Sequence, residues 1–454
     1  MNLISYDPSN GNIVGQVDIT NIEQIPSMVE KAKTAQQEWG NLTVDKRIEY
    51  IGRAAKKLSA KTQELGELLS REMGKDIHRA TGEVNGCGAD AVYRAKEVQA
   101  AIQTQIFKAH NIETQMQYNP LGVCGIIAPW NYPMSMAHWM IIPALTAGNT
   151  VVLKPSEETP LIAQEYVNVF NEVLPKDVLQ IVHGTEEQGK ALVNSKVNFI
   201  GFTGSQEAGR NIMKNASGTL KRLMMELGGK DPLIVMQDAN IDNAAWFAVA
   251  NSFENTGQMC IATERVYVDT KIAAQFERKV VELAKNYQVG AWNDANANLG
   301  PIINDKQRAK ILEQIEDAKL KGAKLLLGGE NHPEHYILPT VLTNLSDDML
   351  ITQKETFGPV ICIERYENVN DAVKAANNSD YGLGASVYGG KDAEIIANQL
   401  EAGMVGINKG ISGVGDTPWV GAKQSGFGYH GSPDGHRQFT QVRVVSRKVS
   451  LFTM

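Results

Sequence analysis

Two side chains, Glu226 and Cys260, stand 34 residues apart and have the types needed for covalent chemistry on a carbonyl group. Glu226 lies in the run M-E-L-G-G-K (225–230), and Cys260 ends the run N-T-G-Q-M-C (255–260). A thiol can attack a carbonyl carbon, and a carboxylate can take up a proton. If the fold brings both side chains to one cavity, they are the minimum equipment for oxidising an aldehyde through a covalent thioester.

The other three cysteines, Cys87, Cys124 and Cys362, are expected to be buried core residues. Cys124 and Cys362 lie inside apolar strand patterns, where burial raises the pKa of a thiol and lowers its reactivity. Cys260 follows a polar, glycine-containing turn, so we expect it to project from a loop. The four cysteines form no C-x-x-C pair, which excludes a disulfide framework and a zinc ribbon and is typical of a reducing cytosol.

Asn131, in the run W-N-Y-P (130–133), offers a third group for the same chemistry. Its amide and the backbone N–H of Cys260 could hold the oxyanion of a tetrahedral adduct, and one such donor contributes ~3–4 kcal/mol in acyl-transfer enzymes. Gly228 and Gly229 follow Glu226 after one residue and would allow a sharp turn and a close backbone approach.

Three further runs are expected to bind a cofactor. The run K-P-S-E (154–157) follows a predicted strand, at the carboxyl end where α/β sheets bind ligands, and offers a cation and an acceptor for ribose hydroxyls. The run G-F-T-G-S (201–205) ends a strand and opens a helix, so its N–H groups could face a phosphate. The run E-T-F-G-P (355–359) has a carboxylate for a ribose and an aromatic side chain for a flat ring.

Alternating strand and helix patterns must position these runs. Strands are predicted at 123–128, 150–153, 178–182, 198–202, 233–236 and 265–268, and helices from about 160, from about 206 and over 241–253. This alternation predicts an α/β protein with parallel sheets covered on both faces. Residues 21–102 are helical in pattern, with breaks predicted at Gly40 and at 84–88.

The chain is expected to divide into two domains and a small β element. We place a cofactor-binding domain at 1–112 and 119–230, and a catalytic α/β domain at 231–420. The runs 113–118 and 436–454 are assigned to a bridging and oligomerisation element, because they contain alternating patterns typical of edge strands that pair with a second subunit.

Composition excludes several other classes of protein. The net charge of −7 argues against nucleic acid as the main partner. No stretch of 18 or more apolar residues occurs, so no membrane span is expected. The start of the chain lacks the features of a signal peptide, and we therefore expect a cytoplasmic protein. The histidines show no H-E-x-x-H spacing, and no metal site is expected.

Taken together, these runs resemble the aldehyde dehydrogenase superfamily over nearly the whole chain. M-E-L-G-G-K, G-Q-x-C and E-x-F-G-P occur in the order typical of that family. The resemblance implies a Rossmann-like cofactor domain, a catalytic domain, and bridging strands that extend a neighbour's sheet in a homodimer or homotetramer. It also implies that Cys260 is the nucleophile, Glu226 the general base and Asn131 the oxyanion donor.

The same resemblance implies a cofactor and a reaction. Cofactor contacts are assigned to Trp130, Lys154, Ser156, Glu157, Gly204, Ser205, Leu227, Glu355 and Phe357. NAD is favoured because a carboxylate at Glu157 repels a 2′-phosphate, and NADP stays open because Lys154 and Ser156 lie close enough in sequence to compensate. The aldehyde would become a carboxylic acid through a thiohemiacetal and a thioester on Cys260. Glu226 favours hydrolysis, since relatives that pass the acyl group to coenzyme A typically lack this base.

Three classes of aldehyde stay open. Succinate-semialdehyde dehydrogenases often carry an arginine where this chain has Trp139, which weakens that alternative unless another cation, such as Arg265 or Lys423, serves. A box resembling that of betaine- and amino-aldehyde dehydrogenases is assigned to Tyr132, Trp139 and Trp419, with Glu254 adding a negative charge. The same aromatic side chains could instead line an apolar tunnel for small aliphatic or aromatic aldehydes.

Two rival functions of another class also stay open. One is a non-catalytic structural or binding role, against which the complete set of Cys260, Glu226 and Asn131 argues. The other is a thiol esterase, which needs the same three groups and no nicotinamide. Dependence of turnover on the cofactor therefore separates the rivals from an aldehyde dehydrogenase.

Overall fold

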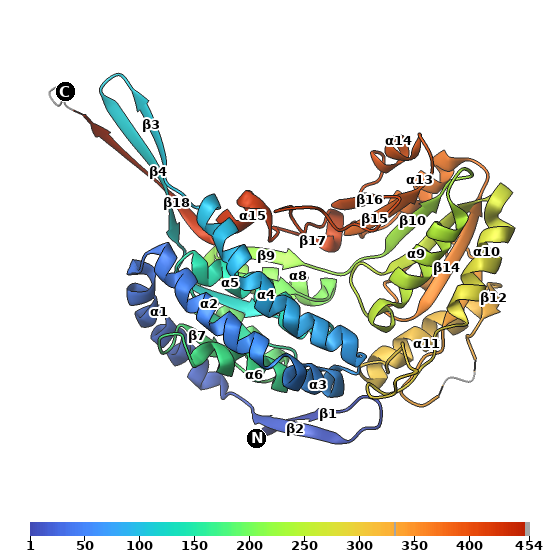
Figure 1. Cartoon of the computed structure of the whole chain (residues 1–454), viewed down its shortest axis with the longest axis horizontal. Coiled ribbons are helices and arrows are strands. Elements are labelled where there is room, and N and C mark those ends of the chain that lie inside the picture. Colours follow the sequence, from blue (N-terminus) through green and yellow to red (C-terminus); the bar gives the residue numbers. More distant parts are fainter. Residues whose placement is uncertain (331–332, 450–454) are drawn as a thin grey trace.

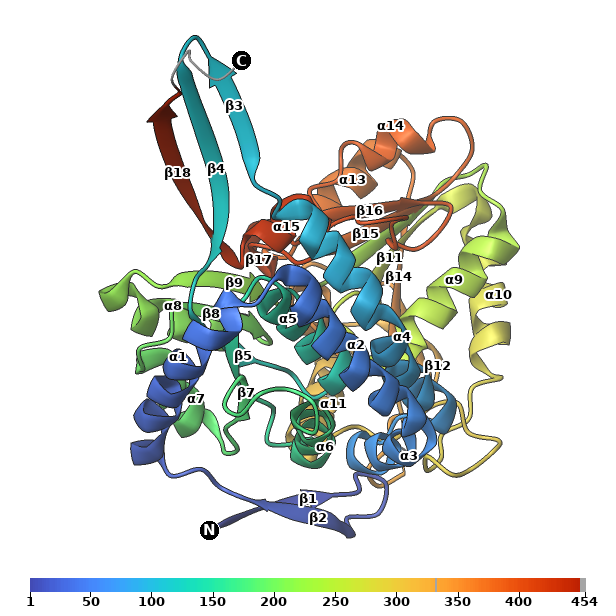
Figure 2. The same ribbon diagram turned by 60° about the vertical axis from the view of Figure 1, so that its left-hand side comes forward.

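The computed structural model describes residues 1–330 and 333–449. Two large β-sheets lie side by side, each flanked by helices, and a β arm projects from the body of the molecule (Figures 1 and 2). Both large sheets are mostly parallel, which confirms the predicted α/β fold class. In the described part of the chain, no helix is both long enough and apolar enough to cross a bilayer.

Most of the residues predicted to bind the cofactor lie in the first sheet or in the loops that follow its strands, whereas Glu355 and Phe357 belong to the second sheet's half of the chain. The six strands of the first sheet, in spatial order, are β17 (Gly426–Phe427), β9 (Arg222–Glu226), β8 (Phe199–Thr203), β5 (Val123–Ile127), β6 (Thr150–Lys154) and β7 (Leu179–Ile181). All neighbours are parallel except β17, which pairs antiparallel with β9. The predicted strands of this region are therefore confirmed to within one or two residues.

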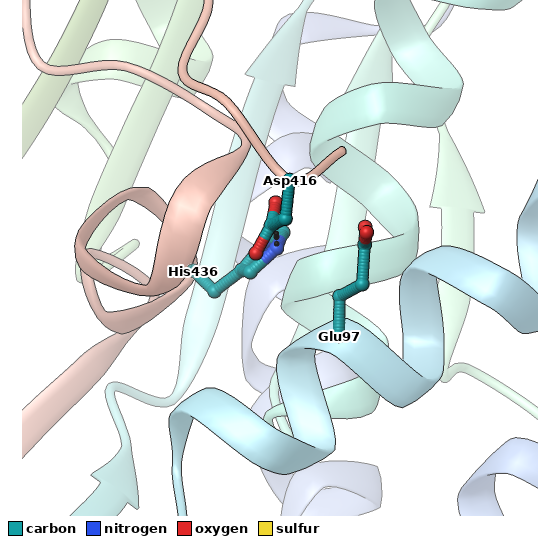
Figure 3. A group of neighbouring side chains, drawn as sticks. All are labelled: Glu97, Asp416 and His436. Atoms are coloured by element: carbon teal, nitrogen blue, oxygen red, sulfur yellow. Dashed lines mark hydrogen bonds and ion pairs between the residues drawn. The ribbon is translucent and has the colours of Figure 1, made fainter. Parts of the chain in front are cut away.

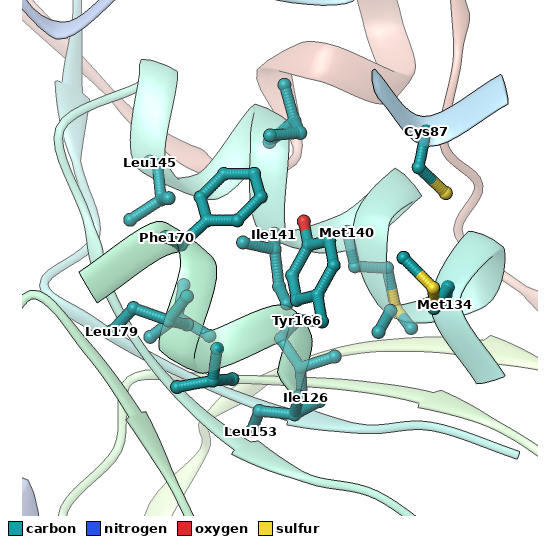
Figure 4. Packing of buried hydrophobic residues seen from close by; sticks show 14 of the residues in the cluster. Cys87, Ile126, Met134, Met140, Ile141, Leu145, Leu153, Tyr166, Phe170 and Leu179 are labelled. Carbon is teal, nitrogen blue, oxygen red and sulfur yellow. The ribbon is translucent and has the colours of Figure 1, made fainter. Parts of the chain in front are cut away.

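Both faces of the first sheet are covered, because its strands are apolar on both sides. On β5, Cys124 and Ile126 join the larger core, which includes residues of α2 to α6, whereas Val123 and Ile127 join a second core with α1, α7 and α8. Figure 4 shows the larger core, in which Tyr166 stacks on Phe170 with ring centroids 4.6 Å apart. The helices are α1 (Ile25–Asn41), α2 (Val44–Ala60), α3 (Thr62–Met73), α4 (Ile77–Ala101), α5 (Pro133–Thr146), α6 (Pro160–Asn171), α7 (Glu186–Asn194) and α8 (Gln206–Ala216).

The break predicted at 84–88 is wrong, because α4 runs without interruption through these residues. Val84 and Cys87 are buried against the core, and Gly88 lets α4 approach α2, where a Cβ would come within 2.3 Å of the Ser59 hydroxyl. Close packing between helices thus outweighs the low helix propensity of the glycines. The predicted break near Gly40 is confirmed, since α1 ends at Asn41.

The second sheet carries the loop with Cys260, which leads into the middle strand of that sheet. Its order is β12 (Lys324–Leu327), β13 (Thr340–Thr343), β14 (Val360–Tyr366), β11 (Thr263–Asp269), β10 (Asp231–Val235), β15 (Gly384–Tyr388) and β16 (Met404–Ile407). Only β12 is antiparallel to its neighbour. The helices that pack around it include α9 (Ile241–Phe253), α10 (Thr270–Ala284), α11 (Asp305–Leu320), α12 (Leu350–Gln353), α13 (Val369–Asn377) and α14 (Ala393–Ala397).

The projecting arm is a three-stranded antiparallel sheet in the order β18 (Thr440–Lys448), β4 (Ile112–Pro120) and β3 (Gln105–Ala109). Both segments predicted as edge strands form strands, but only β18 lies at an edge. The edge prediction for 113–118 is wrong, because β4 pairs on both sides, with β18 and with β3, a third strand that the sequence patterns did not indicate. α15 (Ser432–Arg437) leads into β18, and β1 (Asn2–Tyr6) pairs with β2 (Ile13–Asp18) at the other end of the molecule. Residues 450–454 of the predicted bridging element lie outside the described residues.

Candidate active site

The fold brings Glu226 and Cys260 together. Glu226 is the last residue of β9, at the carboxyl end of a parallel strand, and Cys260 lies in the loop between α9 and β11. The Cys260 Sγ donates to Glu226 Oε1 across 3.6 Å. Cys260 lines a cavity of about 420 Å³ together with Asn131, so the thiol, the carboxylate and the amide predicted from the sequence meet at one place.

The loop that presents Cys260 is held in an unusual backbone conformation. Asn255, Thr256 and Gly257 have consecutive positive φ angles of 50°, 60° and 72°. Non-glycine residues adopt this region at a cost and keep it only where surrounding contacts enforce it. Here the buried side chain of Gln258 donates to the carbonyls of Asn255 and Pro301 and accepts from the backbone N–H of Ile303.

The two glycines after Glu226 permit the close approach that the sequence predicted. A Cβ on Gly229 would lie 2.2 Å from the carbonyl oxygen of Cys260, and a Cβ on Gly228 would lie 2.4 Å from Glu355 Oε1. Neither position can carry a side chain without moving Cys260 or Glu355. The run M-E-L-G-G-K therefore joins the two sheets and lets both neighbouring loops close on the cavity.

Asn131 lies at the start of the loop before α5 and bonds to the Cys260 loop. Its side-chain Nδ2 donates to the carbonyl of Gln258 at 3.0 Å, which uses one of the two hydrogens of the amide. Its own carbonyl accepts from Lys75 Nζ at 2.7 Å and from Asn255 Nδ2 at 3.3 Å. The Asn131 side chain and the loop that carries Cys260 are thus tied to each other.

A buried ion pair supports the Asn131 loop from below. Lys75 Nζ lies 2.7 Å from Glu83 Oε2, and both side chains are almost fully buried. Glu83 Oε1 also accepts from the backbone N–H groups of Met134 and Ser135, which are unpaired donors of the first turn of α5. One carboxylate therefore fixes the beginning of α5, and its lysine fixes the backbone of Asn131.

Glu226 accepts hydrogen bonds from three other elements. Besides Cys260, Trp419 Nε1 donates to Oε1 at 2.8 Å, and Thr203 Oγ1, at the end of β8, donates to Oε2 at 3.2 Å. Burial raises the pKa of Glu226 above its ordinary value, and these hydrogen bonds oppose the rise. A carboxylate whose pKa is raised in this way is a stronger base than an exposed one.

Cys260 differs from the other three cysteines by its surroundings. Cys87, Cys124 and Cys362 are buried in the cores, as predicted, and burial raises the pKa of each thiol. Burial and the charges of nearby carboxylates, first of all that of Glu226, also raise the pKa of Cys260 well above its ordinary value. Cys260 therefore carries its proton at neutral pH and needs an adjacent base, which Glu226 provides at 3.6 Å.

A second hollow of about 520 Å³ adjoins the catalytic cavity and shares Trp130, Gly204 and Ser205 with it. It is also lined by Lys154, Ser156 and Glu157 at the carboxyl end of β6, where Lys154 Nζ lies 3.1 Å from Glu157 Oε2. Ser205 is the N-cap of α8, so backbone N–H groups at the start of that helix face the groove. Hydroxyl-binding groups beside a helix N-terminus fit the ribose and phosphate groups of a dinucleotide.

Glu355, Phe357 and Leu227 line the catalytic cavity on the side of this groove. Glu355 is half-buried and accepts from the backbone N–H of Gly229 at 3.0 Å, and desolvation of its carboxyl group raises its pKa to about 7. Phe357 has a positive φ of 57° and makes an edge contact with Trp130 at 5.5 Å. All nine residues assigned to the cofactor from the sequence thus line one or both of the two hollows. These residues are Trp130, Lys154, Ser156, Glu157, Gly204, Ser205, Leu227, Glu355 and Phe357.

Aromatic side chains line the opposite end of the catalytic cavity. Tyr132, Trp139 and Trp419 are all present there, and the rings of Trp139 and Trp419 lie 6.0 Å apart. Two of these rings already face a cation of the protein: Lys75 Nζ lies 3.9 Å from the Tyr132 ring centroid, and Arg94 lies 5.8 Å from that of Trp139. The aromatic end is therefore less electron-rich than three free rings would be.

The charged residues considered for the substrate have partners elsewhere. Glu254 is bound by Arg79 through two hydrogen bonds of 2.8 and 3.0 Å and accepts from the Tyr132 hydroxyl at 3.3 Å. The two cations suggested for an acidic aldehyde do not line the cavity. Arg265 is buried and donates to carbonyls of the second sheet and α13, and Lys423 pairs with Glu401.

Sequence reasoning missed the residues that support the three reacting groups. Lys75, Glu83, Gln258 and Thr203 make these contacts across 23 to 127 residues of chain, with the shortest separation between Thr203 and Glu226. Thr203 belongs to the run G-F-T-G-S, but nothing in that run indicates its contact with Glu226. Lys75, in the loop between α3 and α4, and Glu83, in α4, stand among many other polar residues, so their types alone did not mark them.

Comparison with known proteins agrees with this geometry. Residues 2–445 match the family described as the aldehyde dehydrogenase family. A probable succinate-semialdehyde dehydrogenase (NADP(+)) of Sinorhizobium fredii is 36% identical over 450 residues, covering 97% of this chain and 91% of that protein. Aminoaldehyde dehydrogenase 2 of Pisum sativum is 34% identical, covering 98% and 92%. The structure of an NADP-dependent glyceraldehyde-3-phosphate dehydrogenase from Bacillus halodurans, complexed with NADP, superposes with a TM-score of 0.95 at 31% identity, covering 99% and 96%.

Proposed function

Because the chain belongs to the aldehyde dehydrogenase family, whose reaction is NAD(P)-dependent aldehyde oxidation, we propose that it converts a small neutral aldehyde into a carboxylic acid through a thioester on Cys260. The observation that carries the proposal is the 3.6 Å contact between Cys260 Sγ and Glu226 Oε1 in a cavity that Asn131 also lines. Thiol, base and amide donor are the three groups that acyl chemistry on a thiol requires.

In the first half of the reaction, Glu226 takes the proton of Cys260 and the sulfur attacks the aldehyde carbon. The oxyanion of the adduct is held by the free hydrogen of the Asn131 amide and by the backbone N–H of Cys260. When bound, the nicotinamide accepts the hydride that turns this adduct into a thioester. The residues fitted to hold the dinucleotide are those of the groove, with Lys154 and Glu157 at the ribose and Ser205 near the phosphates.

In the second half of the reaction, Glu226 acts on water. Once Cys260 carries the acyl group, it has no proton to donate, so the lone pair of Glu226 Oε1 that faced the thiol becomes available to a water molecule. Glu226 first releases to solvent the proton that it took from Cys260, because only the ionised carboxylate can act as a base again. Glu226 then removes a proton from that water as it attacks the thioester carbon, and the carboxylic acid leaves Cys260. A base at this place favours hydrolysis over transfer to coenzyme A.

NAD is the cofactor that the groove favours. The Glu157 carboxylate lies among residues that line the ribose region, where it accepts from a 2′-hydroxyl and repels a 2′-phosphate. Lys154 stands 3.1 Å from Glu157 and offsets part of that repulsion, so use of NADP at lower efficiency is compatible with the same groove. Glu157→Gln should raise the ratio of NADP to NAD efficiency by about tenfold, measured as kcat/KM for each cofactor.

A neutral aldehyde fits the aromatic end of the cavity best. A cationic aldehyde would meet rings that already face Lys75 and Arg94, and Glu254, which contacts the Tyr132 hydroxyl, is bound by Arg79. An acidic semialdehyde would find a single basic residue among those that line the cavity, Lys310, which belongs to the cofactor side with Glu355. Amino-aldehydes are the second candidate, because the Tyr132 hydroxyl connects Glu254 to the cavity wall.

A panel of three aldehydes with both cofactors tests the proposal. Hexanal, 4-aminobutanal and succinate semialdehyde are supplied with NAD or NADP. Formation of the reduced nicotinamide is followed by its absorbance at about 340 nm. Hexanal should give the highest kcat/KM. Turnover of activated esters alone, without any aldehyde oxidation, would instead support an esterase, and no turnover of any substrate would support a structural role.

We also propose that the β arm joins subunits into a homodimer or homotetramer. β18 and β3 are the two edges of the arm, and its strands expose apolar side chains that a lone subunit would leave in water: Ile106, Phe107, Ile112, Val442 and Val444. Light scattering after size exclusion should give a mass of two or four chains. Val444→Lys should shift that mass toward the monomer if the arm forms the contact.

A further inference from the structure

We propose that Trp419 is a positioning residue for the general base: its indole N–H fixes the Glu226 carboxylate beside Cys260 during both halves of the reaction. This inference rests on the function proposed above and assigns to Trp419 a second task besides lining the aldehyde end of the cavity. Trp419 Nε1 donates to Glu226 Oε1 at 2.8 Å, the same oxygen that accepts from Cys260 at 3.6 Å.

The two donors on Oε1 have different fates in the reaction. The Cys260 proton leaves when the sulfur attacks, and no proton returns to the sulfur until the acyl group has gone. The Trp419 N–H cannot be transferred and stays a donor throughout. The Thr203 hydroxyl, 3.2 Å from Oε2, is the only other hydrogen-bond donor to this carboxylate among the described residues. In the thioester, Trp419 therefore still holds Oε1 in the direction from which the thiol proton of Cys260 has been lost.

The Trp419 ring is itself held in place on both sides. Its backbone N–H donates to the carbonyl of His430 at 3.0 Å, and the rings of Trp419 and His430 are parallel to within 8° at 6.4 Å. Trp139 covers another side at 6.0 Å. A side chain confined in this way donates its hydrogen bond with little loss of rotamer entropy at the moment of reaction.

The loop that carries Trp419 has its own anchor, three residues earlier. Asp416 Oδ1 accepts from the backbone N–H of Ser432 at 2.6 Å and from His436 Nε2 at 3.0 Å, both in α15 (Figure 3). Glu97 of α4 stands beside this pair, and the carboxylate and imidazole atoms of the three residues lie within 4.8 Å of one another. The anchor fixes the loop on the side away from the cavity.

The substitution Trp419→Phe removes the N–H and keeps an aromatic ring at the cavity wall. We expect hydrolysis of the thioester to slow about tenfold or more, because a hydrogen bond to a charged group is lost. The acyl group on Cys260 should then persist, which quenching and mass spectrometry of the intact protein can follow in a single turnover. Trp246→Phe is the matched control, since Trp246 is exposed on α9, far from the cavity.

The pH profile separates positioning from packing. The hydrogen bond from Trp419 lowers the pKa of Glu226, so its loss should move the acidic limb of the hydrolysis rate to higher pH. The titratable group in contact with Glu226 is Cys260, which is acylated in this step, and the carboxyl groups of Asp231 and Glu355 also act on Cys260. Neither of these two groups changes in Trp419→Phe. A shift of the acidic limb of the hydrolysis rate therefore reports a change in the pKa of Glu226.

Three outcomes decide between the alternatives. Slow decay of the thioester with a moved acidic limb supports the proposal. An unchanged decay rate, or a loss that appears wholly as a higher KM for the aldehyde, overturns it and leaves Trp419 as part of the cavity wall. Wild-type protein that forms no acyl adduct at all would instead overturn the proposed function, and the two failures are therefore distinguishable.

A second measurement leaves position 419 unchanged, in case Trp419→Phe does not fold. In wild-type protein labelled with 15N-tryptophan, one indole N–H resonance should shift as Glu226 titrates, and Glu226→Gln should abolish that shift. If none of the indole N–H resonances responds to Glu226→Gln, the proposal is overturned, because the contact would then be absent in solution.

Discussion

The two ends of the catalytic cavity are built in different ways. At the cofactor end, the lining residues come from the carboxyl ends of strands such as β6 and β8 and from the start of α8, and polar backbone groups face the groove. At the aldehyde end, they come from the first turns of α5 and from the loop that carries Trp419, and they are mostly apolar or aromatic. Cys260 and Glu226 stand where the two ends meet.

This difference shows how each end acquires its selectivity. A dinucleotide has fixed hydroxyls and phosphates, and we propose that short runs such as K-P-S-E and G-F-T-G-S carry most of its recognition. An aldehyde offers one carbonyl and a variable tail, and its recognition depends on the balance of charges around the rings. Lys75, Arg94 and Arg79 set that balance from behind the cavity wall.

The largest effect is expected where both ends meet. Cys260→Ala removes the nucleophile and should lower aldehyde oxidation at least ~10⁴-fold, as for other covalent catalysts that lose theirs. Binding of NAD should be unchanged, because the groove residues do not contact the thiol; calorimetric titration checks this. Substantial turnover by the variant would reassign the nucleophile.

Loss of the base should block the second half of the reaction more than the first. Glu226→Gln is expected to slow thioester hydrolysis by about 10²-fold to 10⁴-fold, so that a mass increase on Cys260 accumulates with an aldehyde and NAD. In wild-type protein the rate should fall as the pH falls through the pKa of Glu226, which burial raises, because only the ionised carboxylate takes a proton. Glu226→Gln should lack this acidic limb; an identical limb in both proteins would remove Glu226 as the base.

The buried support of the oxyanion donor is the next expected effect. Lys75→Met leaves Glu83 buried without its cation and should lower the free energy of unfolding by about 3–5 kcal/mol, measured by urea denaturation. Because Lys75 also binds the carbonyl of Asn131, kcat should fall as well. Lys57→Met, which breaks an exposed ion pair with Glu172 on the same helical layer, is the matched control and should change neither quantity. Equal effects of the two variants would contradict a special role for Lys75.

The smallest effect is expected at the aldehyde end. Arg94→Gln removes the cation that faces Trp139 and should raise kcat/KM for 4-aminobutanal relative to hexanal by about two- to fivefold, the range of an exposed cation–π contact. Arg53→Gln, whose guanidinium faces the remote Tyr50, is the control. If the ratio of the kcat/KM values for the two aldehydes does not change, charges behind the rings do not govern the choice of substrate.

Much of this architecture was readable from local patterns. The strand over 123–127, the helix over 241–253 and the strand that leads to Lys154 follow from apolar runs bounded by turn residues. The prediction failed at α4, where glycine packing against Ser59 keeps a helix intact, and at β3, whose pairing with β4 gives it a strand conformation that its own pattern did not indicate. Both cases depend on a partner segment elsewhere in the chain.

Residue types and their order along the chain predicted the class of reaction, since a thiol, a carboxylate and an amide in recognisable runs admit few chemistries. Which oxygen of Glu226 faces Cys260, and that Trp419 and Thr203 hold it there, was decided only by folding. Hydrogen bonds require atoms within about 3 Å, and between residues as distant as 226 and 419 that proximity is a property of packed sheets and loops rather than of local sequence.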